Sequence, residues 1–520
     1  MERIAVYVLR HQEYKNIAYT ELMREQWEKV GVGFFRLSVA ELSDSLKTMK
    51  TDEVILYDDR LIGPFYSTAK LLHSDETVSS SWWRLAGNAP LIGLRKEVWR
   101  REDVQAALQS MDIVSSLTAL LGESPELYDT ASLSDLTERP MLDEPFKMVE
   151  NGCPFFEHEV FHRDYDEVII SNLGHQGKLL YNWLCQHAEE WMGPIWDFLL
   201  SNFHQVDIYR NLHLSYVLPS KASDHEKAIR MIRKKGLLLV MHLYYPDKFE
   251  ESYACAARFP KETDVCITTN TLEKADQIRK KFETLGFNKL DVRVIANRGR
   301  DVSSLLVGTV DLLDKHEIVC FFHDKKTLQT KPGSIGLGFA DKLIENMFGS
   351  ADYVLNIVNL FADNERLGML SPPAPHHSDY YFTQGLDWGP NYELTRDLAE
   401  RLGFTVPIAP DKMPIAPLGT CFWFRSKALK PLYDVGWKYE DFPPEPNNVD
   451  GTLLHAIERI YPFAAVNAGY YPAYVLTDRW AKVEYSSLRY YVEGYNKVCF
   501  KHGIMSYQRN MRNELIRRLR

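Results

Sequence analysis

Charged side chains gather directly after two apolar segments just past the middle of the chain. The segment DVRVIA leads into the cluster NRGRD, and EIVCFF leads into the cluster HDKK. Short apolar runs bounded by polar residues are typical of buried strands. In open α/β sheets, ligands bind outside the carboxyl ends of the strands. These two clusters are therefore the first candidates for a binding site.

The first cluster has residue types that bind a phosphate or a sugar. Arg298 and Arg300 offer forked donors for phosphate oxygens, and Gly299 lets the backbone approach a ligand closely. Asp301 could accept hydrogen bonds from sugar hydroxyls or hold Arg300 in place, and Asn297 opens the cluster. Alternatively, this is a polar turn with Asp301 as the N-cap of the following helix. The sequence leaves both interpretations open.

The second cluster places an acid at the end of an apolar segment. Asp324 could present its carboxylate to a divalent metal ion and a diphosphate. His323 precedes it, and Lys325 and Lys326 could neutralise the phosphates of a departing nucleotide. There is one acid here and not a DxD pair, so a metal-binding role for Asp324 competes with a solvated strand end.

A third segment, EDFPPEPNNVDGTLLHAIERI, combines a proline-stiffened loop with a helix. Glu445 or Asp450 could act as a general base, with His455 one turn into the helix. Alternatively, Asp450 is a helix cap, and Glu458 and Arg459 form a structural ion pair on that helix.

Composition limits the class of protein. The chain has 520 residues with 45% hydrophobic and 25% charged residues, which predicts a folded protein of two or three domains. A formal net charge of −10 argues against a general nucleic-acid binder. The N-terminus resembles a strand and not a signal peptide, and no apolar run reaches the length of a membrane span. Seven cysteines without a CxxC motif indicate a reducing compartment, so we expect a cytoplasmic protein.

The order of patterns predicts an α/β architecture with several segments. Residues 1–120 alternate strand and helix signals and predict a small α/β domain with a mainly parallel sheet; 121–150 form an acidic linker; 151–225 have helical spacing; 226–480 form a second α/β domain; and 481–520 form a basic helical tail. TDEVILYDDRLIGP and HEIVCFFHDKKT share an acid, an apolar strand and an aspartate. Duplication and coincidence explain this echo equally well.

Several motifs in a shared order resemble the rhamnan synthesis protein F family, bacterial glycosyltransferase-like proteins that build rhamnose-containing cell-wall polysaccharides. The matching stretches include GHQGKLLYNWL, NLHLSYVLPS, HLYYPD, ITTNT, NRGRDVSSLLVG, CFFHDKKT, LGMLSPPAP, PIAPLGTCFWFRSKALKPL and EDFPPEPNNVDGTLLHAIERIYP. The resemblance implies a GT-A-like glycosyltransferase domain in the C-terminal half. It also implies dTDP-L-rhamnose as the donor and a glycan on a polyprenyl-diphosphate lipid as the acceptor.

The resemblance also implies which residues lie on the donor side of the site and which on the acceptor side. Residues 297–301 and 323–326 match the donor-side motifs, and Glu445, Asp450, His455, Glu458 and Arg459 match the acceptor or catalytic side. The implied reaction is a single inverting displacement, with Asp450 (second choice Glu445) as the base. Arg300, Lys325 and Lys326 would bind the diphosphate, and Asp324 would hold Mg²⁺ or Mn²⁺ if a metal is used.

Two departures from the family pattern keep alternatives open. Asp324 lacks a second aspartate, and YDDRLIGPF has Arg60 where the family segment has serine, so the N-terminal domain is either a degenerate GT-A-like unit or a specialised one. The alternatives are a different nucleotide sugar or a polyol phosphate as donor, or a non-catalytic glycan-binding scaffold. The tail KHGIMSYQRNMRNELIRRLR, with six Lys or Arg, could lie on the anionic inner face of the plasma membrane as an amphipathic helix.

Overall fold

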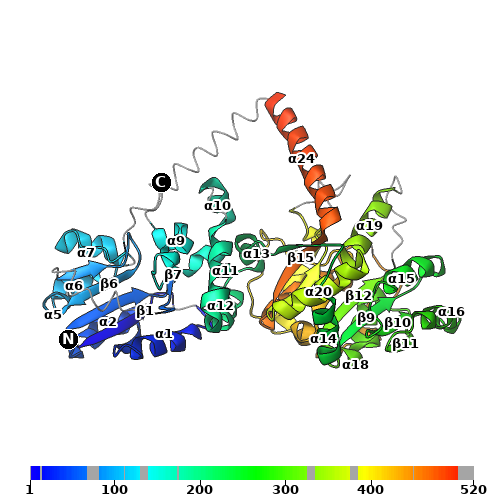
Figure 1. The fold of residues 1–520 in the computed structure, drawn as a ribbon, viewed down its shortest axis with the longest axis horizontal. Coiled ribbons are helices and arrows are strands. Elements are labelled where there is room, and N and C mark those ends of the chain that lie inside the picture. Colours follow the sequence, from blue (N-terminus) through cyan, green and yellow to red (C-terminus); the bar gives the residue numbers. More distant parts are fainter. Residues whose placement is uncertain are drawn as a thin grey trace. The chain divides into compact units, whose positions relative to one another are not determined.

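The computed structural model describes residues 2–11, 14–66, 81–110, 112–128, 139–171, 175–324, 334–374, 385–448 and 450–501. The chain forms two compact units, each built around its own sheet (Figure 1). Unit 1 comprises Met1–Phe203 and Arg210–His213, and unit 2 comprises His204–Tyr209 and Leu214–Arg520. Both units are mixed α/β, which is the class that the sequence predicted.

The sheet of unit 1 has the strand order β2-β1-β3-β6-β5. Its strands are β1 (Arg3–Leu9), β2 (Gly33–Ser38), β3 (Glu53–Asp58), β5 (Trp82–Arg84) and β6 (Leu91–Arg95). β1 pairs in parallel with β2 and β3, whereas β6 is antiparallel to both β3 and β5. The sheet is therefore mixed and not mainly parallel, and the antiparallel β5 and β6 are joined by the short connection of residues 85–90.

Helices cover both faces of this sheet. α2 (Val39–Thr48) begins with a capping box formed by Ser38 and Glu41, and it packs Leu42 and Leu46 into a core that includes Val6. On the other face, Trp27 of α1 (Tyr19–Glu28) donates a hydrogen bond to the Tyr57 hydroxyl at 3.0 Å. Successive side chains of a strand point to opposite faces of the sheet, so β1 and β3 pack against the helices on both faces.

The rest of unit 1 is mainly helical. Its helices are α5 (Lys96–Trp99), α6 (Glu102–Ala107), α7 (Ile113–Leu121), α8 (Pro140–Asp143), α9 (Pro145–Glu150), η1 (His158–Phe161), α10 (Tyr165–Ser171), α11 (Gln176–His187) and α12 (Glu189–Asn202). A short ladder joins β4 (Leu61–Ile62) to β7 (Phe156–Glu157).

The sheet of unit 2 has eight strands in the order β11-β10-β9-β12-β14-β13-β15-β8. These are β8 (Ser215–Leu218), β9 (Leu237–His242), β10 (Asp264–Thr269), β11 (Lys289–Val294), β12 (Ile318–His323), β13 (Leu367–Ser371), β14 (Phe422–Arg425) and β15 (Tyr471–Thr477). β11, β10, β9 and β12 are parallel, and β14 is antiparallel to both of its neighbours. The edge strand β8 comes from the segment that the sequence predicted to be helical.

The helices of unit 2 bury the sheet. They include α13 (Gln205–Leu212, which crosses the unit boundary), α14 (His225–Lys235), η2 (Pro246–Lys248), α15 (Phe249–Ala256), α16 (Leu272–Phe282), η3 (Glu283–Leu285), α17 (Arg300–Ser303), η4 (Ser304–Gly308), α18 (Val310–Leu313), α19 (Ser334–Phe348), α20 (Ala351–Asp363), η6 (Gly389–Asn391), α21 (Tyr392–Arg401), α22 (Ser426–Tyr433), η7 (Tyr439–Asp441), α23 (Leu453–Asn467) and α24 (Asp478–Lys501). Ile457 and Tyr461 of α23 share a core with Phe321 of β12 and Phe422 of β14. Among the described residues, none of the helices has both the length and the apolar content that a membrane span requires.

Candidate functional site

The parallel part of the unit 2 sheet has a switch point between β9 and β12. From β9 the chain runs outward to β10 and β11, and it then returns to place β12 on the opposite side of β9. At such a point the connections leave in opposite directions and open a crevice at the carboxyl ends of the two strands. The HDKK cluster follows β12 at this crevice.

Asp324 closes the first turn after β12. Its backbone N–H donates to the His242 carbonyl at 3.1 Å, and its Oδ2 accepts the backbone N–H groups of Tyr244 and Tyr245 at 2.9 and 2.6 Å. Its Oδ1 is buried without a hydrogen-bond partner. Burial raises the pKa of Asp324, although the two N–H groups oppose this shift. An unsatisfied carboxylate oxygen at a switch point is suited to a ligand.

A buried polar chain lies beneath this turn. His242 Nδ1 contacts Thr268 Oγ1 at 2.8 Å, and Thr268 Oγ1 contacts Ser304 Oγ at 2.7 Å. Burial lowers the pKa of His242 to about 4, against the attraction of the Asp301 carboxylate, so the ring is neutral near pH 7. The buried Oδ2 of Asp301 also has no hydrogen-bond partner.

Hydrogen bonds at Gly419 and Thr420 connect His323 of the second cluster to helix α23. His323 Nε2 contacts the Gly419 carbonyl at 2.9 Å, and the N–H of the same Gly419 donates to Glu458 Oε2 at 3.3 Å. Thr420 Oγ1 donates to that oxygen at 2.9 Å. Arg459 pairs with Glu458 Oε1 at 3.1 Å, which is the structural ion pair that the sequence indicated. The structure thus brings His323, Asp324, Glu458 and Arg459 together.

The first cluster docks on the proline-rich loop. Arg298 donates to the carbonyls of Phe442 and Glu440 at 2.6 and 2.8 Å. Arg300 forms a two-pronged ion pair with Glu445, at 2.8 and 3.2 Å. Both arginines therefore have protein partners: two backbone carbonyls for Arg298, and the Glu445 carboxylate for Arg300.

Backbone geometry corrects the expected helix caps. The N-cap of α17 is Gly299 with φ of +83°, so Asp301 lies in the first turn and is not the cap. The N-cap of α23 is Thr452 and not Asp450. Asn297 is exposed to solvent. Lys325 and Lys326 lie outside the described residues.

Asp450 stands at the end of the proline-rich loop. Its Oδ1 accepts hydrogen bonds from Asn391 Nδ2 and the Gly451 N–H, both at 2.8 Å. Partial burial raises the pKa of Asp450, but these hydrogen bonds and the nearby cations outweigh it and lower the pKa overall. His455 Nδ1 lies 4.0 Å from this oxygen and 2.8 Å from Thr452 Oγ1.

Two charged residues near the site were not among our predictions. Burial raises the pKa of Asp387 to about 6, with Arg459 opposing the shift, and Arg459 Nε donates to the Asp387 carbonyl at 3.0 Å. Lys274 donates to the Tyr244 carbonyl at 2.7 Å and to Asn270 Oδ1 at 2.8 Å. The motif ITTNT precedes Lys274 in the sequence, but only the fold shows that the lysine turns back toward the Asp324 turn.

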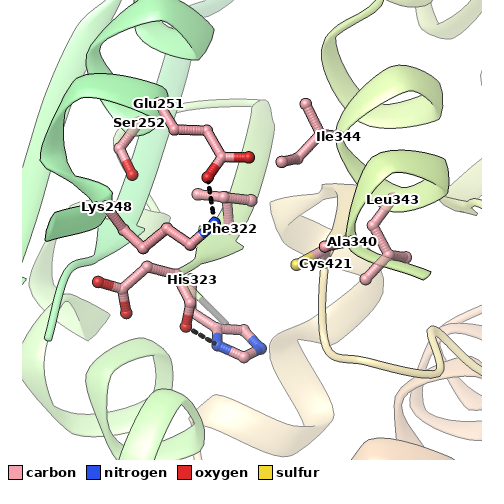
Figure 2. Close-up of a pocket in the computed structure, with 10 residues that line it drawn as sticks. Lys248, Glu251, Ser252, Phe322, His323, Ala340, Leu343, Ile344 and Cys421 are labelled. Atoms are coloured by element: carbon pink, nitrogen blue, oxygen red, sulfur yellow. Dashed lines mark hydrogen bonds and ion pairs between the residues drawn. The ribbon is translucent and has the colours of Figure 1, made fainter. Parts of the chain in front are cut away.

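A small pocket opens beside Asp324 (Figure 2). Lys248 and Glu251 form an ion pair at 2.6 Å on its α15 side, and α19 supplies an apolar wall. The lining residues are Lys248, Glu251, Ser252, Phe322, His323, Asp324, Ala340, Leu343, Ile344 and Cys421. Within the described ranges no three His, Cys, Asp or Glu side chains converge to hold a metal ion. Mg²⁺ is often held by one or two carboxylates together with substrate phosphates, and Asp324 Oδ1 fits that arrangement.

Comparison with known proteins gives limited matches to individual chains. Two curated proteins, each named uncharacterized protein WxcX and found in Xanthomonas campestris pv. campestris strains B100 and ATCC 33913, are 29% identical over 233 residues. The match covers 45% of this chain and 32% of theirs, so the chain spans about a third of their length. Among solved structures, the apo-form glycosyltransferase GlyE of Streptococcus pneumoniae TIGR4 aligns with a TM-score of 0.22 at 11% identity, over 63% of this chain and 87% of its own. Shikimate dehydrogenase of Mycobacterium tuberculosis aligns with a TM-score of 0.12 at 8% identity, over 70% and 100%.

The family comparison covers much more of the chain. The model of rhamnan synthesis protein F matches residues 124–470, more than half of the sequence. The matched region contains the Asp324 turn, the NRGRD cluster and the proline-rich loop, which are the features that the structure brings together. The chain belongs to the rhamnan synthesis protein F family.

Proposed function

We propose that this chain is a glycosyltransferase of polysaccharide assembly, and that unit 2 binds its nucleotide-sugar donor at the switch point between β9 and β12. The observation that carries the proposal is the buried Asp324, with an unpartnered Oδ1, at the mouth of that crevice. Family membership supports the activity. The strand order, in which an antiparallel β14 separates β12 from β13, supports a GT-A-like arrangement.

The proposed donor is dTDP-L-rhamnose, and the proposed reaction inverts the anomeric carbon. A base removes the proton of the acceptor hydroxyl, the hydroxyl oxygen bonds to the anomeric carbon, and the bond from that carbon to the diphosphate oxygen breaks. Cations must neutralise the departing diphosphate. Lys325, Lys326 and Lys274 are the proposed cations. A bound Mg²⁺ or Mn²⁺ would supply further neutralisation, held by Asp324 Oδ1.

Three carboxylates compete for the role of base. Glu445 is already paired with Arg300, which makes it the weakest candidate. Asp450 is 45% exposed and has a lowered pKa, so it is ionised but a poorer proton acceptor. Asp387 has a pKa of about 6, nearer to a working pH of 7, which suits general-base catalysis. We therefore place Asp387 beside Asp450 as a candidate.

The proposed acceptor is a glycan on a polyprenyl-diphosphate lipid at the cytoplasmic face of the plasma membrane. Contact with the membrane would come from the basic tail. Helix α24 is described as far as Lys501, and residues 502–520 lie outside the described part of the chain. The exposed helix α24 carries Tyr485, Leu488 and Val492 at helical spacing, which is compatible with an interfacial surface.

The first test is a thermal-unfolding titration of the purified chain with a panel of nucleoside-diphosphate sugars, with and without Mg²⁺ or Mn²⁺. A ligand at about 100 times its Kd stabilises the native state by about 2.7 kcal/mol. We expect dTDP-L-rhamnose to raise the Tm of the wild type but not of Asp324→Asn. The control is Arg396→Ala, a surface change on α21 that leaves the crevice intact.

Turnover assays then assign the base. Release of dTDP from dTDP-L-rhamnose in the presence of a lipid-linked acceptor is compared for Asp387→Asn, Asp450→Asn and Glu445→Gln. The base variant should lose at least about 100-fold in kcat. If no nucleotide sugar stabilises the protein, the proposed donor site is wrong, and the result favours the non-catalytic glycan-binding scaffold.

A further inference from the structure

Unit 1 has the same aspartate turn as unit 2, at the same place in its own sheet. After β3, the N–H of Asp59 donates to the Val8 carbonyl at 3.2 Å. Its Oδ2 accepts the N–H groups of Arg10 and His11, which follow β1, at 2.9 and 2.8 Å. Asp59 therefore ties the end of one parallel strand to the end of its neighbour.

The correspondence with unit 2 holds residue by residue. Val8 is paired with Asp58 in the register of β1 and β3, as His242 is paired with His323 in the register of β9 and β12. In both units the residue after this pair is the aspartate, and it accepts the N–H groups of the second and third residues after Val8 or His242 on the opposite strand. The echo that the sequence left undecided is therefore a repeated structural device.

The position in unit 1 is also a switch point. From β1 the chain runs outward to β2, and it then returns to place β3 on the other side of β1. The crevice between these two carboxyl ends is where an open α/β sheet binds its ligand. Residues 1–123 lie outside the matched family region.

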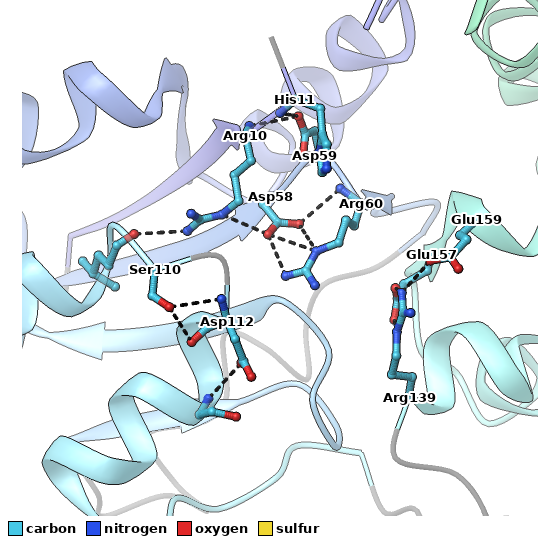
Figure 3. A network of polar contacts seen from close by, with 12 residues as sticks. Arg10, His11, Asp58, Asp59, Arg60, Ser110, Asp112, Arg139, Glu157 and Glu159 are labelled. Carbon is cyan, nitrogen blue, oxygen red and sulfur yellow. Dashed lines mark hydrogen bonds and ion pairs between the residues drawn. The ribbon is translucent and has the colours of Figure 1, made fainter. Parts of the chain in front are cut away.

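Arg10 gives this crevice an unsatisfied donor. Its side chain is fully buried, its Nε lies 3.1 Å from Asp58 Oδ2, and its Nη2 donates to the Leu108 carbonyl at 3.1 Å (Figure 3). Its Nη1 is buried with no hydrogen-bond partner. A buried donor without a partner is costly, and a ligand oxygen would satisfy it.

Two side chains at the same turn are accessible to a ligand. His11 is 33% exposed and its Nδ1 contacts Asp59 Oδ1 at 2.9 Å. The imidazole also stacks on Tyr14, with ring centroids 5.0 Å apart. Arg60 is 28% exposed and holds Asp58 with Nε and Nη2. The crevice thus offers a guanidinium and an imidazole on a rigid base.

Charge balance decides the class of ligand. Asp58 contacts both arginines, and Asp59 contacts His11, so the two positive side chains are already matched by two carboxylates. A diphosphate would meet these carboxylates without a surplus of positive charge. Sugar hydroxyls are neutral and both donate and accept hydrogen bonds. We propose that the crevice between β1 and β3, with Arg10, His11 and Arg60, is a second ligand site that binds a neutral carbohydrate.

The test uses the full-length chain on an array of neutral and phosphorylated or carboxylated oligosaccharides, followed by calorimetry with the best neutral ligand. The variants are His11→Ala and Arg60→Ala, and each is checked for cooperative thermal unfolding. The controls are Arg101→Ala, an exposed arginine of the same unit, and Asp324→Asn in unit 2. We expect Kd to rise at least 10-fold in both variants and to stay unchanged in both controls.

Several outcomes would overturn the proposal. These are the absence of binding to any neutral glycan, binding to anionic glycans alone, or binding that survives in His11→Ala and Arg60→Ala. Loss of binding in Asp324→Asn with retention in the two unit 1 variants would place the carbohydrate in unit 2. If Arg60→Ala does not fold, His11→Ala decides, because His11 is partly exposed and its loss opens no cavity. Since the Asp324→Asn control reports on the donor site, this result is independent of the proposed transferase activity.

Discussion

At the residue scale, Gly299 shows how tightly the first cluster is held against the proline-rich loop. Its φ is +83°, and a Cβ added there would lie 2.8 Å from Phe442 Cγ and 2.7 Å from Ser303 Cβ. Gly286 has a similar φ of +64°, but an added Cβ meets nothing within 4 Å. Both glycines have a left-handed backbone, but only Gly299 has close neighbours, so comparing substitutions at the two positions separates backbone strain from steric conflict.

We therefore expect Gly286→Ala to lower the free energy of unfolding by about 1 kcal/mol, because the left-handed backbone strains any L side chain. Gly299→Ala should cost about 1–3 kcal/mol more, since the loop must also move away from the new methyl group. Denaturant unfolding of the two variants measures the difference. Equal losses would show that the NRGRD loop is not packed against Phe442.

Asp387 gives a second residue-scale prediction. Its folded pKa of about 6 lies above that of an ordinary aspartate, so folding favours the protonated form. This contribution to stability is fully present below about pH 4 and is lost as the pH rises through about 6. The side chain introduced in Asp387→Asn cannot ionise. The free energy of unfolding of this variant should therefore rise by on the order of 1–2 kcal/mol relative to that of the wild type as the pH goes from 4 to 7.5.

Unfolding free energies of wild type and Asp387→Asn at the two pH values check this expectation. Asp397→Asn is the matched control, because Asp397 is exposed on α21 and its change should leave the pH dependence as it is. If the difference in unfolding free energy between the two pH values were the same in Asp387→Asn as in the wild type, the assigned pKa would be contradicted.

At the scale of elements, the ion pair between Arg300 and Glu445 joins the start of α17 to the proline-rich loop. The two side chains are 39% and 25% exposed, and the pair has two contacts. Exposed pairs contribute little to stability, typically below 1 kcal/mol. We therefore expect a double-mutant cycle of Arg300→Ala and Glu445→Ala to give a coupling energy of about 0.5–1 kcal/mol in unfolding.

The same cycle measured on donor binding should give the clearer signal. If the ion pair positions the loop for substrate, each single variant raises the Kd for the nucleotide sugar. The double variant then raises this Kd no more than either single variant does. Additive effects on Kd would instead mean that Arg300 contacts the donor directly, as the family resemblance implies.

The sequence predicted elements better than contacts. Short apolar runs located β9, β10 and β12, and the HDKK cluster follows β12 at the carboxyl edge of the sheet. The partner of Arg300 is 145 residues away in sequence, so no local pattern could assign it. The expected caps were wrong because Gly299 and Thr452 compete with aspartates two residues away, and only backbone angles decide between them.

Other parts of the site lay outside any local signal. Asp387 is an ordinary aspartate in sequence, and its raised pKa comes from burial by segments distant in the chain. The strand β8 has four residues with alternating exposure, which is too short a pattern to separate from the helical segments before it. Burial and register are properties of the folded chain.

At the scale of the whole molecule, the two units have the same aspartate turn at the switch points of their sheets. Each places an aspartate after the second strand of a switch point and holds it with two backbone N–H groups. The side chains around the aspartate then differ: arginines and a second carboxylate in unit 1, and histidines in unit 2. The shared backbone device fixes the geometry, and the neighbours set the charge that a ligand meets.

The edge strand β8 also has a consequence for how the protein is made. β8 pairs with β15, and Ser220 just after it donates two hydrogen bonds to Asp478, 258 residues later. A ribosome adds about 5–20 residues per second, so β8 leaves the exit tunnel roughly 10–50 s before its partner exists. During that interval the nascent chain exposes an unpaired strand, and the sheet of unit 2 is completed only once β15 has been made.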